Sequence, residues 1–580
     1  MSSNANRRAF FQNLAAPSRV KEAGLLEQSQ SVSRYADINA EQQISRFLAQ
    51  ATLGPNKALI DYVGSIGIEA WLDEQFNSPQ SEIYAYMQAN LYDESKMLER
   101  FPERHLFRYA LWDHMINGND LLRQRVALAL AEIFVISTEV DEIYSAATGV
   151  GMWYDMLLKH AFGNFRDLLF DVTVSPMMGR YLSHAGNRKT DLNLGRFPDE
   201  NYAREIMQLF SIGLFYLNED GSLELDGNGE PIPTYDNSHI TEFAKIFTGL
   251  NYDHDGDPYF GDDWEPTFEN AWVTPHSSVR PMKMFEEVHE PGPKTLLEGY
   301  VVPAGQSGMQ DINAALDHLF WHQNTPPFIV VGLIKFLVKS NPSPDYIYRV
   351  VQVFKDNGSG VRGDMQATVR AILLDDEARS LYYITDPTNG RMREPFFKLV
   401  QLMRAFDYAN PQNKYWDSGW RIEREIRQFP FNAQSVFNFF SPGFVPAGPL
   451  AANQLTGPEF QTLNSYTAIS IINFWYETLD WKYVFDLPDE NTPVRGATVS
   501  VDQPQPNLAY LTSLVEAEDF DTLMYFLDTL FTYGTLSQAS WDIIKSSIVG
   551  YAAEETEGTE AVVRFAIFLF MVSPEYNIQV

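Results

Sequence analysis

Hydrophobic residues recur at helical spacing along most of the chain. Ile44, Phe47, Leu48 and Ala51 share one face of a helix that ends at Gly54-Pro55. Strand-like alternation is scarce, so the pattern predicts an all-α fold, a multi-helix assembly with a small β-hairpin and a long irregular insertion. The further predicted helices cover 68–76, 82–98, 103–117, 120–137, 151–160, 164–172, 311–322, 327–340, 344–356, 364–374, 393–408 and a region near 459–479, with three or four more in 508–580.

Turn-forming residues mark the predicted hairpin and the boundaries of the chain's regions. Asp226-Gly227-Asn228-Gly229 separates two short extended runs between Gly221 and Tyr235, which predicts the hairpin. Asp, Pro, Gly and Trp are frequent in 251–310, which predicts a long irregular loop. Loops of this length often bind ligands or control access to a site. The predicted organisation is a flexible N-terminal segment (1–40), an N-terminal helical region with the hairpin (41–250), the acidic insertion (251–310), a central helical region (311–485), a linker (486–507) and a C-terminal helical region (508–580).

Composition narrows the function classes. Lys and Arg number 43 against 76 Asp and Glu, a formal charge of −33, which disfavours nucleic-acid binding and favours cations or a basic partner. The absence of cysteine excludes disulfides, thiolate nucleophiles and cysteine-ligated metals. Apolar runs are broken by charge, as Glu132 breaks Val126 to Ile136, so no transmembrane segment is expected.

The N-terminus carries an incomplete export pattern. Arg7-Arg8-Ala9-Phe10-Phe11 resembles the core of a twin-arginine signal, but Asn13, Pro17 and Lys21 interrupt the apolar stretch that should follow. An ordinary amphipathic segment is the other interpretation. We therefore expect an extracytoplasmic or secreted protein, with a cytoplasmic location as the alternative because no complete signal peptide is present.

The segment 184–213 combines a polar, glycine-containing loop with a predicted helix that Pro198 begins and Gly213 closes. At about 100° per residue, the polar half of this helix holds Glu200, Asn201, Arg204, Glu205 and Gln208. The pattern is typical of a solvated face, and a polar cluster that works with neighbouring loops is the alternative.

The same segment resembles a bacterial family catalogued as domain of unknown function 1800. The resemblance rests on Pro198-Asp-Glu-Asn-Tyr-Ala-Arg-Glu205 and on blocks in the same order elsewhere. These blocks include Arg46 to Pro55, Leu122 to Val126, Thr234 to Gly249, His289 to Lys294, His322 to Phe328, Arg393 to Pro395, Ser435 to Phe440, Pro458 to Phe460 and Phe570 to Glu575.

The resemblance implies no reaction, because the family's activity is not established. It implies a secreted or envelope setting and a protein partner with a sulfatase-like fold. The chain departs from a frequent family pattern, since Leu130-Ala131-Glu132-Ile133 stands where many relatives show Trp-His-x-His, which weakens metal binding there.

Polar clusters define the catalytic hypothesis, which is a hydrolase. Glu200 or Glu205 would act as general base, Arg204 would orient it, and His289 or Lys294 would supply the second proton transfer. The signature segment also offers His184, Asn187 and Asn201 as binding residues. A turn held by side-chain hydrogen bonds is the alternative interpretation of His289 and Lys294.

Two patterns allow metal binding. His318 and His322 are spaced i,i+4, as helical metal ligands are, although His322 could instead cap the helix end as a cation. Asp253, Asp255 and Asp257 match a calcium loop in ligand type but lack the glycine and glutamate of an EF-hand. An acidic turn is the simpler interpretation, so we expect no cofactor, with calcium or a transition metal as the alternative.

Nucleophile-elbow, phosphate-loop and dinucleotide motifs are missing from the sequence. The leading hypothesis is a binding or assembly protein that acts with a protein partner, and the alternative is the hydrolase, with or without a metal. The sequence leaves the oligomeric state open.

Overall fold

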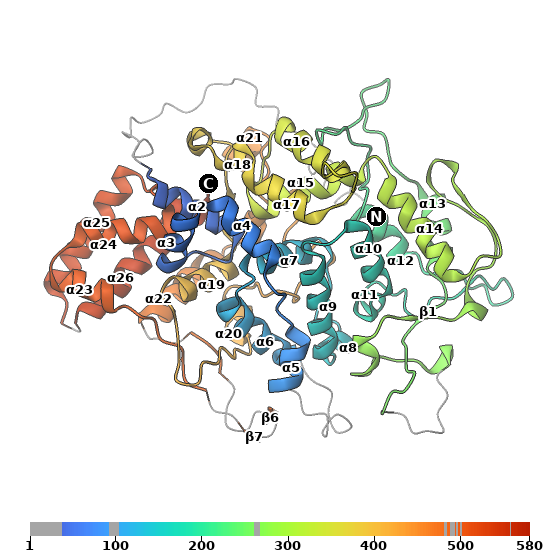
Figure 1. The fold of residues 1–580 in the computed structure, drawn as a ribbon, viewed down its shortest axis with the longest axis horizontal. Coiled ribbons are helices and arrows are strands. Elements are labelled where there is room, and N and C mark those ends of the chain that lie inside the picture. The colour runs from blue at the N-terminus through green and yellow to red at the C-terminus, as the bar shows by residue number, and fades with distance from the viewer. Residues whose placement is uncertain are drawn as a thin grey trace.

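The computed structural model describes residues 38–91, 104–259, 267–480, 484–487, 493–494, 497–498, 501–556 and 558–580. Its fold is all-α, as predicted, with a few two-residue strands (Figure 1). The arginine pair Arg7-Arg8 lies outside the described residues. No helix in the described part of the chain has the length and apolar character needed to cross a membrane.

The helices of the N-terminal half are α2 (Ala40–Ala51), α3 (Lys57–Ile66), α4 (Ile68–Asn77), α5 (Ile83–Asn90), α6 (Arg104–Asn117), α7 (Leu121–Ile133), α8 (Asp141–Tyr144), α9 (Ala147–His160), α10 (Phe165–Val174), α11 (Pro176–Tyr181), α12 (Asn201–Gln208) and α13 (Asn237–Ile246). Those that follow are α14 (Gly308–Trp321), α15 (Thr325–Leu337), α16 (Pro344–Lys355), α17 (Met365–Leu374), α18 (Asp376–Arg379), α19 (Pro395–Ala405), α20 (Trp420–Glu425), α21 (Pro449–Ala452), α22 (Thr467–Asp480), α23 (Ala509–Glu516), α24 (Phe520–Leu527), α25 (Gln538–Glu554), α26 (Thr559–Val572) and α27 (Pro574–Asn577).

Capping residues set several helix starts that periodicity misplaces. Helix α14 begins at Gly308, ahead of the predicted 311, because the Ser307 hydroxyl accepts the N–H of Gln310 and the Gln310 side chain accepts the N–H of Ser307. The signature helix begins at Asn201 and not at Pro198. The Asp199 carboxylate accepts the N–H of Asn201, so the chain turns once more before the helix starts.

Two predicted helices need correction, and a third helix was missed. The helix predicted over 82–98 ends at Asn90, and 92–103 lies outside the described residues. The region near 459–479 contains a 3-10 turn, η8 (Pro458–Thr462), and then α22. A new helix starts there because the side-chain Oδ1 of Asn464 accepts the N–H groups of Tyr466 and Thr467. Helix α3 was not predicted at all.

The predicted hairpin is present as single bridges and not as a continuous ladder. Leu225 pairs with Pro231 across the turn, where Asp226 N donates to Glu230 O at 2.8 Å. The preceding segment joins as a third arm, since Leu217 pairs with Leu223 and Phe215 pairs with Pro233. The proline residues remove N–H donors, which limits the ladder to isolated pairs.

The insertion is irregular, as predicted, and is held by short antiparallel pairs. These are β1 (Leu250–Asn251) with β2 (Lys283–Met284), and β3 (Lys294–Thr295) with β4 (Val301–Val302). Short 3-10 turns lie between them, namely η3 (Phe268–Asn270), η4 (Ser277–Val279), η5 (Glu286–Val288) and η6 (Leu297–Gly299).

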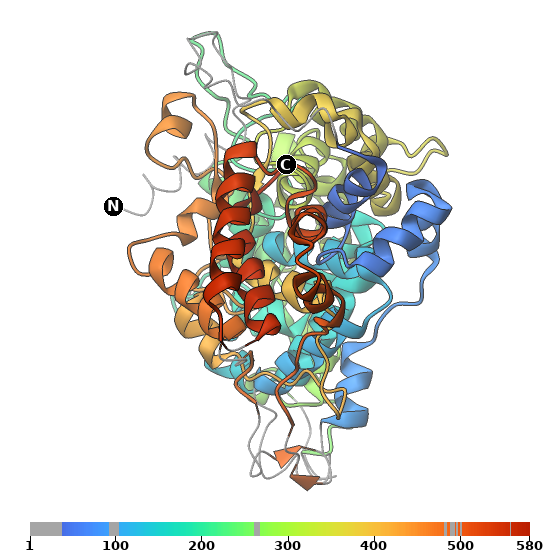
Figure 2. The same cartoon turned by 90° about the vertical axis from the view of Figure 1, so that its left-hand side faces the viewer.

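The two ends of the described chain lie together. Helix α2 packs against the π-helical turn η9 (Asp528–Thr532), and Figures 1 and 2 show the first helices beside the C-terminal ones. Strand β8 (Ile578–Gln579) pairs with β5 (Arg391–Met392) in the middle of the chain. One hydrophobic core cluster includes side chains from Phe47 to Tyr576, so the helical regions share a common interior. The remaining strands are β6 (Pro493–Val494) and β7 (Ala497–Thr498), with a 3-10 turn η7 (Leu381–Thr385).

Candidate functional site

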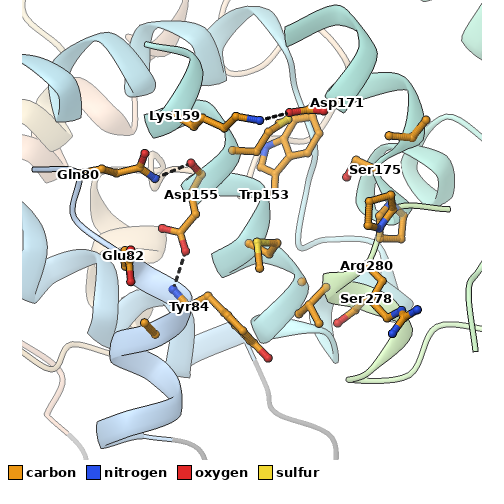
Figure 3. Close-up of a pocket in the computed structure, with 18 residues that line it drawn as sticks. Gln80, Glu82, Tyr84, Trp153, Asp155, Lys159, Asp171, Ser175, Ser278 and Arg280 are labelled. Carbon is orange, nitrogen blue, oxygen red and sulfur yellow. Dashed lines mark hydrogen bonds and ion pairs between the residues drawn. The ribbon is translucent and has the colours of Figure 1, made fainter. Parts of the chain in front are cut away.

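A cavity of about 520 Å³ lies between α5, α9, the α10–α11 junction and η4 (Figure 3). Its volume is within the range of small-molecule sites, roughly 300–1,000 Å³. The lining is mostly apolar, with a few polar groups. The lining residues come from four segments: Gln80, Glu82, Tyr84 and Ala85; Gly149, Met152, Trp153, Asp155, Met156 and Lys159; Asp171, Val174, Ser175 and Pro176; and Ser278, Val279, Arg280 and Pro281.

Helix α9 supplies one wall of this cavity through a stripe at helical spacing. Gly149, Met152, Trp153 and Met156 recur at i, i+3, i+4 and i+7 and so share one face. Gly149 allows η4 to approach, since a Cβ there would lie 2.9 Å from the Cβ of Ser278 and 2.8 Å from Met177. The stripe therefore combines flexible thioethers with close backbone packing.

Among the polar groups of the cavity, Asp155 has the pKa that is raised furthest from its usual value. Its carboxylate accepts the N–H of Ile83 at 2.7 Å and the N–H of Tyr84 at 2.9 Å, and it thereby caps the start of α5. Burial raises the pKa of Asp155 to about 7. The two backbone hydrogen bonds lower this pKa, whereas the negative charges of Glu82 and Asp120 raise it further. The group therefore changes charge near neutral pH.

The cations of the cavity already have carboxylate partners. Lys159 Nζ lies 2.8 Å from Asp171, and His160 Nε2 lies 2.7 Å from the same carboxylate oxygen. Burial alone would raise the pKa of Asp171, but the bonds from His160 and Lys159 hold it below its usual value. Arg280 donates through Nε to Asp253 at 2.9 Å.

Asp155 and Glu82 differ from these paired groups, because neither has a cationic partner among the described residues. The cavity can therefore offer a ligand an apolar wall and carboxylate oxygens with spare lone pairs.

The proposed acid–base residues of the signature helix lie elsewhere. Arg204 forms an ion pair with Glu200 at 3.4 Å, and the Thr241 hydroxyl donates to Glu200 at 3.0 Å. Glu205 is buried, 1% exposed, as is Gln208, so the expectation of a solvated polar face is wrong for these two. Helix α13 packs against this helix, and burial together with the charge of Glu205 raises the pKa of Tyr181 on α11 to about 12.

His289 and Lys294 do come together, around a third residue that sequence reasoning missed. His289 Nε2 lies 3.0 Å from Asp311, and Lys294 forms an ion pair with the same oxygen. All three side chains are buried, and Gln306 donates to the second Asp311 oxygen at 2.9 Å. His289 Nδ1 contacts the carbonyl of Thr248 at 2.8 Å. These contacts bind the insertion to α14, and none of the three residues is among those that line the cavity of Figure 3.

The predicted binding residues hold the signature loop in place. His184 stacks on Tyr202 with ring centroids 3.8 Å apart and donates through Nε2 to the carbonyl of Thr173. Burial lowers the pKa of His184 to about 4. Asn187 accepts the N–H of Asp199 at 2.8 Å, and the backbone N–H of Asn201 donates to Asp199.

The histidines proposed as metal ligands have separate protein contacts. His318 donates through Nε2 to Leu297 O at 3.1 Å and stacks on Tyr300. His322 accepts the N–H of Asn324 at 3.1 Å, and burial lowers its pKa to about 4. His322 is the residue at which α14 ends, but its ring bonds to the segment that follows the helix, and its lowered pKa favours the neutral ring over a cationic cap.

The three acidic residues proposed for calcium also point to different partners. Asp253 pairs with Arg280, and Asp255 pairs with Lys283 at 2.8 Å. Asp257 accepts from the Thr274 hydroxyl at 2.6 Å and contacts a histidine ring at 2.8 Å. Across the described residues, no group of three or more His, Asp or Glu side chains could hold a metal ion.

One feature of the sequence, the face of α9, could have indicated the cavity. Helix α9 places Asp155 and Lys159 beside a stripe of Met and Gly, whereas a core helix usually presents larger, less flexible residues there. The other walls could not be assigned, because three separate segments fold against this helix.

Comparisons with known proteins give a family and nothing more specific. A family model described as "Protein of unknown function (DUF1800)" matches residues 46–578. No curated protein matches the chain, and no solved structure does.

Proposed function

This chain belongs to the DUF1800 family of proteins of unknown function, and from that premise we propose that it is a binding protein for a small amphipathic molecule. The ligand has an apolar body and a cationic or hydrogen-bond-donating end. The observation that carries the proposal is the cavity of about 520 Å³, in which a mostly apolar lining meets the Asp155 carboxyl.

The charge distribution supports a donor at the polar end of the ligand. Lys159 and Arg280 are neutralised by Asp171 and Asp253, whereas Asp155 and Glu82 add negative charge. A cation or N–H group placed beside Asp155 would gain a charge-assisted hydrogen bond in a partly desolvated site. The overall charge of −33 also attracts cations to the protein surface.

The test uses the fluorescent probe N-phenyl-1-naphthylamine, an apolar secondary amine. We expect saturable binding with one site per chain. Met152→Trp fills the wall of α9 and should weaken binding at least about tenfold. The matched control is Ile543→Trp, because Ile543 is exposed on α25. Equal binding by both variants, or no saturable binding by the natural protein, would contradict the proposal.

A second candidate function, assembly with a protein partner, is favoured by one surface feature. Asp191 and Arg196 pair through two backbone hydrogen bonds of 3.0 Å and form a tight turn. At this turn Leu192, Leu194 and Phe197 are 78, 72 and 66% exposed. Adjacent exposed apolar residues of this kind are typical of interaction sites. A partner with a sulfatase-like fold, in an extracytoplasmic setting, is the form of this hypothesis that the family resemblance favours.

The assembly function is tested by capture from native lysate with the natural chain and with Leu192→Ser/Leu194→Ser. Recovery of one protein in near-equal amount with the natural chain, and its loss with the variant, would support assembly. Recovery of the monomer alone in both experiments would contradict it.

A further inference from the structure

A second cavity, of about 420 Å³, lies between the segment that follows α20 and the start of α22. Its lining is mostly polar, in contrast to the cavity of Figure 3, and it shares no residue with that cavity. Amide side chains dominate it: Gln428, Asn432, Gln434, Asn438, Gln461 and Asn464.

Several of these side-chain amides use only one of their two polar groups, the NH₂ or the carbonyl oxygen, in hydrogen bonds within the protein. Asn438 donates through Nδ2 to Glu132 at 2.6 Å, which leaves its carbonyl oxygen as an acceptor. Gln461 accepts the N–H of Ser441 at 2.7 Å, and Asn464 accepts the N–H groups at the start of α22. Among the described residues, the NH₂ groups of Gln461 and Asn464 have no acceptor, so they are donors for a ligand.

The backbone around this cavity is strained. Arg427, Phe431 and Asn438 have φ values of 63°, 60° and 57°, in the left-handed region that non-glycine residues rarely adopt. Such residues persist only where the surroundings fix their backbone. Gln428 contributes to that fixation, since it donates to Glu394 at 2.6 Å and accepts the N–H of Phe396. The amides from Gln428 to Asn438 are therefore presented by a rigid segment.

The lining offers few charges to a ligand. Glu423 is neutralised by an ion pair with Arg108. The Arg427 guanidinium lies 5.2 Å from the ring centroid of Tyr466, which is half exposed at the cavity. One basic side chain is too little to select a multiply charged ligand.

We propose that this cavity binds a neutral carbohydrate. Sugar hydroxyls both donate and accept hydrogen bonds, and the lining offers both kinds of partner, an acceptor at Asn438 and donors at Gln461 and Asn464. The apolar faces of sugar rings match the aromatic side chains of Tyr466 and Phe439. The cavity has no cluster of cations among its lining residues, as a phosphorylated sugar would need. Nor does this lining offer the apolar subsites that the side chains of a peptide would need.

The test is calorimetric titration of the purified full chain with maltotriose, cellotriose and triacetylchitotriose. Trialanine and glucose 6-phosphate serve as comparison probes. We expect one of the three trisaccharides to bind with one site per chain. Gln461→Glu and Asn464→Asp retain the carbonyl-type acceptor that each structural hydrogen bond uses, and they replace the donor NH₂ with an oxygen. Each should weaken binding at least about tenfold, because a sugar hydroxyl then loses its partner.

The matched control is Gln310→Glu, since Gln310 also accepts a backbone N–H and is exposed at the start of α14. This variant should bind the trisaccharide like the natural chain. Circular dichroism establishes that all three variants fold. Failure of all three trisaccharides to bind, binding that Gln461→Glu and Asn464→Asp leave unchanged, or preferential binding of trialanine or glucose 6-phosphate would overturn the proposal.

Discussion

The Asp155 carboxylate in the middle of α9 accepts the backbone N–H of Tyr84 at 2.9 Å, at the start of α5. This contact joins two walls of the cavity and places an acidic group with a pKa of about 7 at its edge. The same residue therefore affects both the stability of the fold and the binding of a ligand.

The contribution of Asp155 to the free energy of unfolding should fall as the pH rises from 5 to 8. The folded pKa of Asp155, about 7, lies above its unfolded value of 3.8, so the native state binds a proton that the unfolded state has lost. The stabilising contribution is complete below about pH 4 and disappears as the pH passes 7. Burial also raises the pKa of Asp113 to about 6 and of Asp417 to about 7, which adds to the same trend.

Asp155→Asn should reduce this pH dependence by about 1–3 kcal/mol between pH 5 and 8, because the asparagine does not titrate. Urea unfolding at both pH values measures the change. Asp542→Asn, on the exposed side of α25, is the control and should leave the pH dependence as it is. An equal pH dependence in Asp155→Asn and the natural chain would show that Asp155 is not the group responsible.

The buried cluster of His289, Lys294 and Asp311 should stabilise the fold without taking part in ligand binding. Asp311→Asn leaves the Lys294 ammonium buried without a carboxylate, which costs about 3–5 kcal/mol. The exposed pair Asp255 and Lys283 provides the control, and Asp255→Asn should cost less than about 1 kcal/mol. Both values come from urea unfolding, and probe binding to the cavity should persist in folded Asp311→Asn. A small change in stability with complete loss of binding would instead favour a direct role in the site.

Metal analysis should find well below one equivalent of calcium or of any transition metal in protein purified without chelator. Asp253, Asp255 and Asp257 are engaged by separate partners, and His318 and His322 have different contacts. Plasma mass spectrometry on the untagged chain measures this. Near-stoichiometric metal would require these side chains to exchange their present partners for an ion.

Periodicity predicted the helical fold because most helices bury one face, as α2 does with Phe47, Leu48 and Ala51. It failed at α12, where Glu205 and Gln208 are buried by neighbouring helices, since the spacing of polar residues does not reveal what packs against them. The sequence placed His289 and Lys294 in one loop and left open a functional role or a turn held by side-chain hydrogen bonds. Asp311 was missed because it lies 17 positions beyond Lys294, on another element.

The candidate cavity was not predicted for a related reason. Asp155 meets Ile83 and Tyr84 across 72 and 71 positions of sequence, and Arg280 approaches from the insertion. Each segment alone resembles an ordinary helix or turn. Only their packing creates a site, and single-sequence patterns carry no information on such long-range contacts.

The most direct test of the central claim compares octylamine, octanol and octanoate by titration calorimetry at pH 8. The three probes share an apolar body and differ in the head group that meets Asp155 and Glu82. The account predicts that octylamine binds with one site per chain, at least about tenfold more tightly than octanoate, with octanol between them. Met152→Trp should abolish this preference, whereas Ile543→Trp should retain it. Octanoate binding as tightly as octylamine, or no binding of either, would contradict the account.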